Sequence, residues 1–468
     1  WRVPRTGQMR VDGLVFASEA MMQALRDDQS LQQVVNVAHL PGIVGHSIAM
    51  PDIHWGYGFP IGGVAAFDAD NGVISPGGIG YDINCGVRLL ASGLSRADVA
   101  GKMPELVESL FRHIPSGVGA HRQDMRLSSR DLRQVLTQGA AWAVSQGYGT
   151  ARDLEHSEEN GCLHGAEPEA VSERALERGR PQLGSIGSGN HFVEVDYVAD
   201  IYDAAAAQAL GLWPGQIVVS IHTGSRGLGY QVCDDALQLM QRATTRYGIT
   251  IPDRQLCCAP LHSPEAQTYM GAMSSAANFA FANRQVITHR VRQTFAEVLQ
   301  RAAADVRLEV IYDVCHNIGK FETHMVEGQA RRVCVHRKGA TRALPPGHAQ
   351  LPAVYRQLGQ PVLVPGDMGR YSYVLLGTSQ GGSETFASSC HGAGRLLSRT
   401  QAKKATHARA IARELQARGI EVRSAGRATL MEEIPEAYKD VSDVVDVAQG
   451  AGISTKVAQL RPLGVIKG

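Results

Sequence analysis

Histidine and cysteine stand beside glycine in five separate segments of the chain. These segments are Gly77–Gly86, Gly184–His191, His222–Gly227, His316–Gly319 and Ser389–Arg395. A single histidine next to glycine is more often a hydrogen-bonded turn residue than a ligand, but five such segments are harder to explain in that way. Loops at strand ends can bring side chains together from distant parts of a sequence. We therefore expect one site that is assembled from these loops.

Asp82 and Cys85 provide the first candidate metal ligands. They lie three residues apart on a glycine-flanked loop, so a carboxylate and a thiolate can face one cation. The neutral imidazoles of His191, His222 and His316 can complete one or two metal shells. Cysteine with three histidines favours zinc, whereas carboxylate oxygens favour manganese or magnesium, so the ligand types leave the metal open. The alternative for Cys85 is a small buried apolar residue, as most free cysteines are.

His191 also begins a strand-like run that ends at Val195. Successive side chains of a regular strand point to opposite faces, so His191 and Glu194 would face opposite ways. A twist or a bulge would be needed to bring both side chains into one pocket.

The segment His391–Arg395 has the composition of a phosphate-binding loop. Gly392 and Gly394 let backbone N–H groups approach a phosphate, and the positive end of a following helix would add to this. Arg395 can clamp a phosphate with two hydrogen bonds. His391 can attack a phosphorus atom when its other ring nitrogen is held by an acceptor, and we expect Asp52 to be that acceptor.

Basic side chains continue after this loop. Arg395, Arg399 and Lys403 are spaced by four residues and would form one basic stripe on a helix. Beside a phosphate-binding loop, such a stripe is one candidate path for a nucleic-acid backbone. The alternative is an ordinary solvated helix face. The sequence contains no G-x-x-x-x-G-K-[ST] loop and no strand–G-x-G-x-x-G–helix unit, which disfavours the common nucleotide-binding classes.

Helical and strand-like patterns alternate along the chain and predict a mixed α+β fold. Helices are expected near residues 18–35, 131–146, 228–247, 264–304 and 396–418, the first with Ser18 as its N-cap. Strands are expected at Val64–Phe67, Val87–Leu90, His191–Val195, Ile217–His222, Leu308–Val314, Arg331–Val335 and Val362–Val364. The polar stretch 120–181 is the best candidate for an insertion.

Composition narrows the class of protein further. The 46 basic and 45 acidic side chains leave a net charge of +1, which argues against a nucleic-acid coat but allows a local basic groove. The eight cysteines are scattered without a C-x-x-C pair, so a disulfide framework is not expected. No apolar run of membrane-spanning length occurs. We expect a soluble, cytoplasmic monomer without a membrane partner.

At these residues the sequence resembles the RtcB family of RNA-splicing ligases, nearly from end to end. The motifs that carry the resemblance are Met50–Gly58, Gly80–Arg88, Gly187–Phe192, His222–Gly227, His316–Asn317, Cys390–Arg395 and the terminal Val465–Gly468. Together they are highly specific. The resemblance implies the α+β architecture of that family, with one catalytic domain over residues 1–468 around a deep two-metal cleft and the stretch 120–181 as an insertion within it.

The resemblance also implies an activity. Members join RNA ends that carry a 3′-phosphate or a 2′,3′-cyclic phosphate to a 5′-hydroxyl end, with GTP and two Mn²⁺ ions, in RNA repair or tRNA splicing. The reaction would pass through guanylylated His391 and an RNA-3′-pp-G intermediate, with Asp52 and Arg395 as further catalytic residues. The sequence leaves open the physiological RNA and the need for an archease-like activating partner.

Residue roles follow from the same resemblance. The implied metal ligands are Asp82 and Cys85, shared between the two ions, with His191 on one ion and His222 and His316 on the other. The implied GTP-binding residues are Asn190, His191, Glu194, His316, Asn317, Pro365, Gly366, Asp367, Met368, Ser372, His391, Gly392, Ala393, Gly394, Tyr438 and Lys467. The implied RNA-binding residues are Arg395, Arg399 and Lys403. Asp367 stands where some members have serine, and its carboxylate would either repel a phosphate or help to bind a metal.

Two other functions use the same residues. A two-metal phosphoesterase acting on RNA ends would need the metal ligands but neither His391 nor a guanine pocket. An RNA-end binding protein with a vestigial site would need neither metal nor GTP, but every expected polar position is occupied here, which disfavours it.

Overall fold

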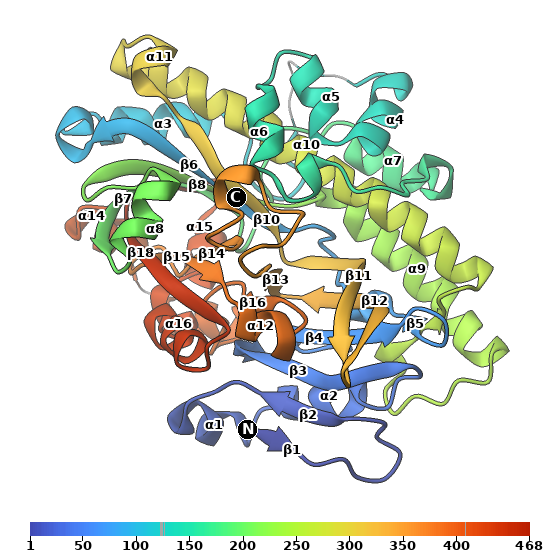
Figure 1. Cartoon of the computed structure of the whole chain (residues 1–468). Coiled ribbons are helices and arrows are strands. Elements are labelled where there is room, and N and C mark those ends of the chain that lie inside the picture. The colour runs from blue at the N-terminus through green and yellow to red at the C-terminus, as the bar shows by residue number, and fades with distance from the viewer. Residues whose placement is uncertain (122–124, 126, 408) are drawn as a thin grey trace.

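Two β-sheets organise the computed structural model, which describes residues 1–121, 125, 127–407 and 409–468 (Figure 1). The first sheet has six strands in the order β1 (Arg2–Val3), β2 (Asp12–Val15), β3 (Ile43–His54), β4 (Ile61–Asp68), β12 (Gln329–Lys338) and β11 (Asn317–Val326). The second follows the order β10 (Glu309–Cys315), β6 (Gly86–Ser95), β8 (Gln216–Thr223), β7 (Phe192–Ile201), β18 (Ser454–Lys467), β15 (Ser372–Gly377) and β14 (Pro361–Val364), and β17 (Glu421–Ser424) pairs with β18. Two short pairs join β13 (Ala340–Arg342) to β16 (Ser388–Cys390) and β5 (Val73–Ile74) to β9 (Ala259–Pro260).

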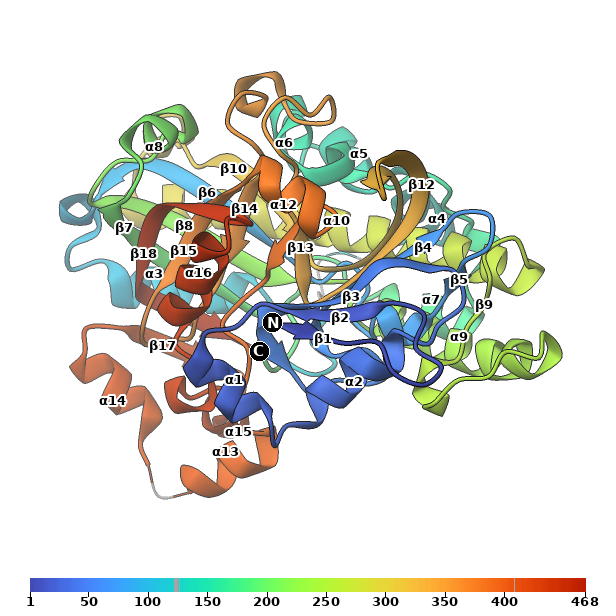
Figure 2. The ribbon, with the colours of Figure 1, turned by 60° about the horizontal axis from the view of Figure 1, so that its bottom comes forward.

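Helices surround the two sheets. In chain order they are α1 (Glu19–Leu25), α2 (Gln29–Val37), α3 (Met103–His113), α4 (Ser129–Gln138), α5 (Ala140–Ser145), α6 (Ala151–Glu155), α7 (Glu173–Gly179), α8 (Ala204–Leu210), α9 (Arg226–Arg246), α10 (Pro264–Leu299), α11 (Ala303–Val306), α12 (Ser379–Glu384), α13 (Arg399–Ala405), α14 (Ile411–Ala417), α15 (Arg427–Glu432) and α16 (Val441–Gly450). Figure 2 shows α13, α14 and α15 grouped at one edge of the molecule, beside β17.

Alternation along the central strands sorts their side chains onto two faces. On β8, Ile217, Val219 and Ile221 pack with residues of α3 and α10, whereas Val218 packs on the opposite face with α8. His222 therefore shares its face with Val218 and points away from α10, because residues two and four apart on a strand face the same side. On β7, Val193 packs with the α3 and α10 cluster, so Glu194 lies on the same side as His222.

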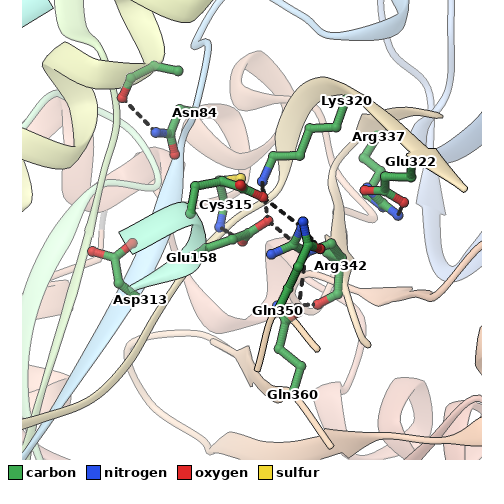
Figure 3. Close-up of polar contacts among 12 residues, drawn as sticks. Asn84, Glu158, Asp313, Cys315, Lys320, Glu322, Arg337, Arg342, Gln350 and Gln360 are labelled. Atoms are coloured by element: carbon green, nitrogen blue, oxygen red, sulfur yellow. Dashed lines mark hydrogen bonds and ion pairs between the residues drawn. The ribbon is translucent and has the colours of Figure 1, made fainter. Parts of the chain in front are cut away.

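The segment 120–181 packs into the body of the molecule. Leu132 and Val135 of α4 and Trp142 of α5 are buried in one core cluster with residues of α9 and α10. Buried charges add to this contact (Figure 3): Lys320 of β11 binds Glu158 and Glu159 at 2.6 and 3.1 Å. Arg342 of β13 binds the same two carboxylates at 3.3 and 2.7 Å. The segment thus shares its core with the rest of the chain, and its origin as an insertion stays a prediction.

The seven strand predictions overlap strands β4, β6, β7, β8, β10, β12 and β14, with His191 and Leu308 one residue before the observed starts of β7 and β10. Four helix predictions were wrong in extent. The predicted helix 264–304 runs past the end of α10 at Leu299 and into α11. Residues 18–35 form two helices, because Asp28 caps a second one after α1, although Ser18 is the N-cap of α1 as expected. Gly139 separates α4 from α5 with a φ of +57°, a conformation that glycine adopts readily. Residues 396–418 contain α13 and α14 as separate helices.

Within the residues that the structure describes, none of the helices has the length and apolar character needed to cross a lipid bilayer.

Candidate active site

A cavity of about 410 Å³ opens between the two sheets, on the side of the eight-stranded sheet that faces away from α10. Predicted site residues that line it are Asp82, Cys85, Asn190, Glu194, His222, His316, Asn317, Pro365, Gly366, Asp367, Met368, Ser372, His391, Gly392, Ala393, Gly394, Arg395, Arg399, Tyr438 and Lys467. Asp52 and His191 lie directly behind this lining, where they hydrogen-bond to His391 and Asp82. Lys403 is outside the lining.

One end of the cavity holds the five predicted metal ligands. The Sγ atom of Cys85 lies 3.3 Å from Nε2 of His222 and 3.4 Å from Nε2 of His191. Nε2 of His316 lies 3.3 Å from Nε2 of His222, and Oδ2 of Asp82 lies 2.7 Å from Nε2 of His191. These atoms form two groups that share Cys85: Cys85 with His222 and His316, and Cys85 with Asp82 and His191. A second role for Asp82, in both metal shells, stays a prediction.

The chemistry of this donor set fits bound cations. The Nε2 atoms of His222 and His316 face each other. If both rings are neutral and carry their hydrogen on Nδ1, both Nε2 atoms present lone pairs, which a cation can bind. Burial, followed by the neighbouring histidines, lowers the pKa of both rings well below the ordinary value, so the neutral, metal-binding form is favoured. Their Nδ1 atoms have no hydrogen-bond partner among the described residues. Burial and then the Asp82 carboxylate raise the pKa of the Cys85 thiol, a barrier that coordination to a dication removes.

A strained turn positions Asp82 and Cys85. Asn84 has a φ of +52°, a left-handed conformation in which asparagine is enriched. Its Nδ2 donates to the carbonyl of Ala277 on α10 at 2.7 Å. Arg284, also on α10, donates to the carbonyl of Asn84 at 2.9 Å and is itself held by buried Asp313. The long helix therefore supports the loop of the candidate ligands Asp82 and Cys85 from behind the sheet.

His191 resolves the alternation problem noted in the sequence. Strand β7 begins at Phe192, so His191 belongs to the preceding loop and is not bound by the alternation that places Glu194. Its Nδ1 accepts from the backbone N–H of Gly187 at 3.1 Å, which directs Nε2 toward Asp82 and Cys85.

His391 stands at the other side of the ligand cluster, with its ring centroid 4.9 Å from that of His316. Nδ1 of His391 and Oδ2 of Asp52 are 2.6 Å apart. The same oxygen accepts from the backbone N–H groups of His391 and Gly392 at 2.9 and 3.2 Å. Burial opposes ionisation of Asp52 most strongly, but His391 and then Lys439 outweigh it, so the pKa of Asp52 lies below its ordinary value. The carboxylate is thus suited to hold Nδ1–H and leave Nε2 free.

Glu194, Glu433 and Lys467 form another wall of the cavity, and Asp196 lies outside the lining beside Glu194. Glu194 and Asp196 are two residues apart on one face of β7 and are both buried. Burial, and for Glu194 the neighbouring Asp196, raises the pKa of both carboxyls. The ammonium of Lys467 donates to the carbonyl of Gly189 at 3.1 Å and lies 3.5 Å from Glu433. This wall offers both acceptors and a donor to a polar ring.

Arg395 is arranged differently from the sequence prediction. It precedes α13, which begins at Arg399, so the three basic residues do not share one helix, and no helix begins directly after the glycine loop. Its guanidinium donates to Glu433 and to the Tyr438 hydroxyl, both at 3.0 Å, and to the carbonyl of Glu432 at 2.7 Å. It also lies 4.9 Å from the centroid of the Tyr438 ring. These contacts fix Tyr438 in the cavity wall.

Asp367 is engaged by its own loop. Its carboxylate binds the Arg370 guanidinium and accepts from the backbone N–H of Gly369 at 3.0 Å. Arg370 in turn donates to the carbonyls of Pro435 and Tyr438. The negative charge of Asp367, which could have repelled a bound phosphate, is therefore balanced by Arg370.

Known proteins are similar in sequence to this chain over nearly its whole length. A sequence model of the family described as "tRNA-splicing ligase RtcB" matches residues 33–468. The chain belongs to the RtcB family. It is 54% identical to the tRNA-splicing ligase RtcB of Thermococcus kodakarensis, over 100% of this chain and 97% of that protein. It is 54% identical to the RNA-splicing ligase RtcB of Mycobacterium tuberculosis, over 93% of this chain and 100% of that protein.

Several residues of this RtcB-family cavity escaped the sequence analysis. Glu433 is buried and joins Arg395, Tyr438 and Lys467, but as part of a Glu-Glu pair it looks like a surface residue. Lys338 ends β12 and donates to the carbonyls of Phe59 and Gly77 at 3.1 Å each. Because β12 also carries Arg331, Arg332 and Arg337, no pattern in the sequence marks Lys338 as a cavity residue.

Proposed function

We propose that the chain is a GTP- and Mn²⁺-dependent RNA ligase that joins 3′-phosphate or 2′,3′-cyclic phosphate ends to 5′-hydroxyl ends. The observation that carries the proposal is the position of His391. Its ring is held by buried Asp52 through Nδ1 and stands beside the ligand cluster in the same cavity. A phosphoesterase would need the ligand cluster alone, without a histidine that is prepared in this way.

Metal ions would be held by Cys85 with His222 and His316, and by Cys85 with Asp82 and His191. Bound Mn²⁺ supplies positive charge that neutralises phosphate oxygens and the negative charge that develops on them during transfer.

His391 is the proposed nucleophile. With Nδ1–H donated to Asp52, the lone pair of Nε2 can attack the α-phosphorus of GTP. The N–P bond forms as the bond between the α-phosphorus and the bridging oxygen breaks, and pyrophosphate leaves. Asp52 stabilises the positive charge that the ring gains.

The remaining steps return the histidine to its starting state. An oxygen of the RNA 3′-phosphate attacks the same phosphorus, the N–P bond breaks, and the RNA end becomes RNA-3′-pp-G. The 5′-hydroxyl oxygen then attacks the terminal RNA phosphorus, GMP leaves, and a 3′–5′ phosphodiester remains. A 2′,3′-cyclic end must first be opened by water to give the 3′-phosphate.

Guanine would be bound by the wall that contains Glu194, Lys467 and Tyr438. A carboxylate can accept from the N1–H and amino groups of guanine, an ammonium can donate to its carbonyl, and an aromatic ring can stack on its face. All three residues line the cavity that also contains His391. Asn190, Asn317 and Ser372, in the same lining, are proposed to contact the phosphates or ribose.

The test is incubation with α-labelled GTP and Mn²⁺, with the unaltered chain and with His391→Ala. The unaltered chain should retain label in a bond that acid breaks and alkali does not, as a histidine phosphoramidate requires. His391→Ala should retain none while its metal content is unchanged. Label on the variant would remove His391 from this role, and hydrolysis of terminal RNA phosphates without any labelled protein would favour the phosphoesterase.

A further inference from the structure

Three tyrosines form a row that runs from the cavity to the surface of α9. Tyr57 and Tyr81 line the cavity. Their ring centroids are 5.8 Å apart in an edge-to-face arrangement. The ring of Tyr81 is stacked on that of Tyr230, with centroids 4.7 Å apart. Tyr230 lies in the first turns of α9 and is 47% exposed.

The tyrosine row (Tyr57, Tyr81 and Tyr230) is held in place from below. Tyr57 and Tyr81 are partly buried and pack against the core cluster under α9 and α10. The Lys338 ammonium binds the backbone carbonyl of Tyr57 and those of Phe59 and Gly77, which fixes the loop that carries the first ring. The rings are therefore a pre-formed surface whose ordering cost is already met by the fold.

A cation stands at the outer end of the row. The guanidinium carbon of Arg178 on α7 lies 5.2 Å from the centroid of the Tyr230 ring. One of its nitrogens donates to Oε1 of Gln231 at 2.9 Å, which keeps the guanidinium over the ring. Burial raises the pKa of Tyr81 and of Tyr57, and the nearby carboxylates of Asp234 and Asp253 add to this, while Arg254 opposes it at Tyr57. This mixture of charges does not suit a track of phosphates, whereas the exposed ring suits an uncharged, flat partner.

The row is continuous with the place where the proposed chemistry occurs. Tyr81 directly precedes the metal ligand Asp82 in the chain. An RNA end that reaches the cluster must leave the cavity with its next nucleotides still attached. A protein partner seated on the row would cover the cavity mouth that this RNA needs.

We propose that the tyrosine row is a stacking platform for unpaired bases of an RNA end bound in the cavity. This inference rests on the proposed function, in that RNA is the substrate. Every base has an aromatic face, so stacking on tyrosine and arginine is tolerant of sequence. The row gives the ligase a hold on RNA ends of any sequence near the break.

Tyr230 provides the sharpest test, because it lies outside the cavity lining and can be changed without touching a metal ligand. Affinity is measured by fluorescence anisotropy with a short unpaired RNA that carries a 3′-phosphate, and in parallel with one that carries a 5′-hydroxyl. Mn²⁺ is present and GTP is absent. Tyr230→Ala should weaken binding of at least one of these RNAs about tenfold, and Tyr230→Phe should not. Tyr247→Ala changes another exposed tyrosine, at the opposite end of α9, and should bind as the unaltered chain does.

Abasic substitutions in the RNA connect the ring to a base. Moving one abasic site along the RNA should reveal a position near the end at which affinity falls about tenfold for the unaltered chain and for Tyr230→Phe. The same abasic RNA should cause no further loss with Tyr230→Ala, because the ring and the base are then both absent.

The outcomes separate this inference from the proposed function. If the unaltered chain forms no guanylyl adduct but the ring and the base remain coupled, the proposed function fails and the platform stands. If the adduct forms but neither Tyr230→Ala nor any abasic site alters affinity, the platform is overturned. A change in oligomeric state with unaltered RNA affinity would assign Tyr230 to a protein contact and would overturn it as well.

Discussion

At the scale of single residues, burial and hydrogen bonding determine the protonation state and the orientation of the reactive side chains. His391 has one ring nitrogen bound to a carboxylate that is fully buried and accepts three hydrogen bonds. His222 and His316 are kept neutral by burial, the form in which imidazole binds a metal. The surrounding structure thus determines protonation state and ring direction before any substrate is present.

Asp52→Asn tests the preparation of His391. The amide lacks the negative charge that stabilises the ring once Nε2 has bonded to phosphorus, so the rate of guanylyl-adduct formation should fall by at least about a hundredfold. Rapid-quench measurement with labelled GTP gives this rate. Manganese content should not change, since Asp52 is not among the grouped ligands. An adduct rate equal to that of the unaltered chain would exclude Asp52 from the reaction.

Cys85→Ala tests whether Cys85 is a ligand shared by both proposed metal ions. Because Cys85 belongs to both ligand groups, its loss should reduce bound manganese from about two ions per chain to one or fewer. Elemental analysis after dialysis measures this ratio. Cys162→Ala, which removes a thiol outside both ligand groups, serves as the control. Unchanged stoichiometry in Cys85→Ala would show that the thiolate is not a ligand.

Asp196→Asn tests the buried carboxyl pair through the pH dependence of stability. Burial raises the pKa of Asp196 in the folded chain, so the folded state holds a proton that the unfolded state releases above about pH 4. The free energy of unfolding therefore falls as pH rises from there to the folded pKa. The amide that replaces this carboxyl cannot ionise, so the variant should gain stability relative to the unaltered chain as pH rises from about 5 to about 8.

Urea unfolding at both pH values measures this difference. Asp200→Asn, which changes an exposed carboxylate on the same strand, is the matched control. A constant difference for Asp196→Asn would mean that its carboxyl ionises equally in both states.

At the scale of elements, the seven predicted strands lie within or next to observed strands, but long strands such as β3 and β18 were missed and helix boundaries were predicted poorly. On strand β8, Ile217, Val219 and Ile221 pack with α3 and α10, and His222 on the opposite face lines the cavity. This alternation is visible in the sequence. The helix breaks depend on caps. Ser398 with Gln401 forms a capping box that starts α13, a local signal that the predicted continuous helix 396–418 overlooked.

Site residues could be predicted from the sequence where a reactive side chain needs a hydrogen-bond partner of a known type. They could not be predicted where a residue enters the site only through tertiary packing. Asp52 was predicted because a nucleophilic histidine needs an acceptor, although 339 residues separate the two. Glu433 was missed because its burial results from the packing of α15 and β18 around Arg395 and Lys467, and no spacing reveals that. The alternation of β7 suggested a conflict for His191 that disappears because the strand starts one residue later.

Lys320→Met tests the buried charges that join residues 158–159 to β11 and β13. The substitution leaves two carboxylates facing Arg342 alone in a buried setting, and we expect a loss of about 3–5 kcal/mol in the free energy of unfolding. Urea unfolding provides the value. Lys102→Met removes an exposed pair with Glu105 and should cost less than about 1 kcal/mol. A loss as small as that of the control would mean that water reaches the Lys320 cluster.

At the scale of the whole molecule, the site exists only because both sheets and several loops meet. Asp52 comes from β3 of the six-stranded sheet, His222 from β8 of the eight-stranded sheet, and His391 from the loop after β16. A ligase must admit two RNA ends to one such cleft. The tyrosine row lies on one side of the mouth, and Arg399 lies in the lining beside Glu433 and Tyr438.

Glu432 determines how much Arg399 and Lys403 can contribute to RNA binding. Its carboxylate binds Lys403 at 2.5 Å and lies 3.7 Å from Arg399, so an RNA phosphate must compete with it for both cations. Glu432→Gln should therefore strengthen RNA binding and steepen its salt dependence, because more counterions are then displaced from the RNA. Replacing both Arg399 and Lys403 by alanine should weaken binding and flatten the salt dependence by up to about 1.4 in the log–log slope.

Titration of labelled RNA over a series of salt concentrations measures both effects. Guanylylation with labelled GTP, recorded for each variant, separates loss of RNA binding from damage to the nucleotide site. Arg409→Ala removes a nearby arginine that is paired with Glu414 and Glu436 and should leave the slope unchanged. If Glu432→Gln and the double alanine variant both keep the original slope, Arg399 and Lys403 form a solvated face, and the RNA backbone follows another path to His391.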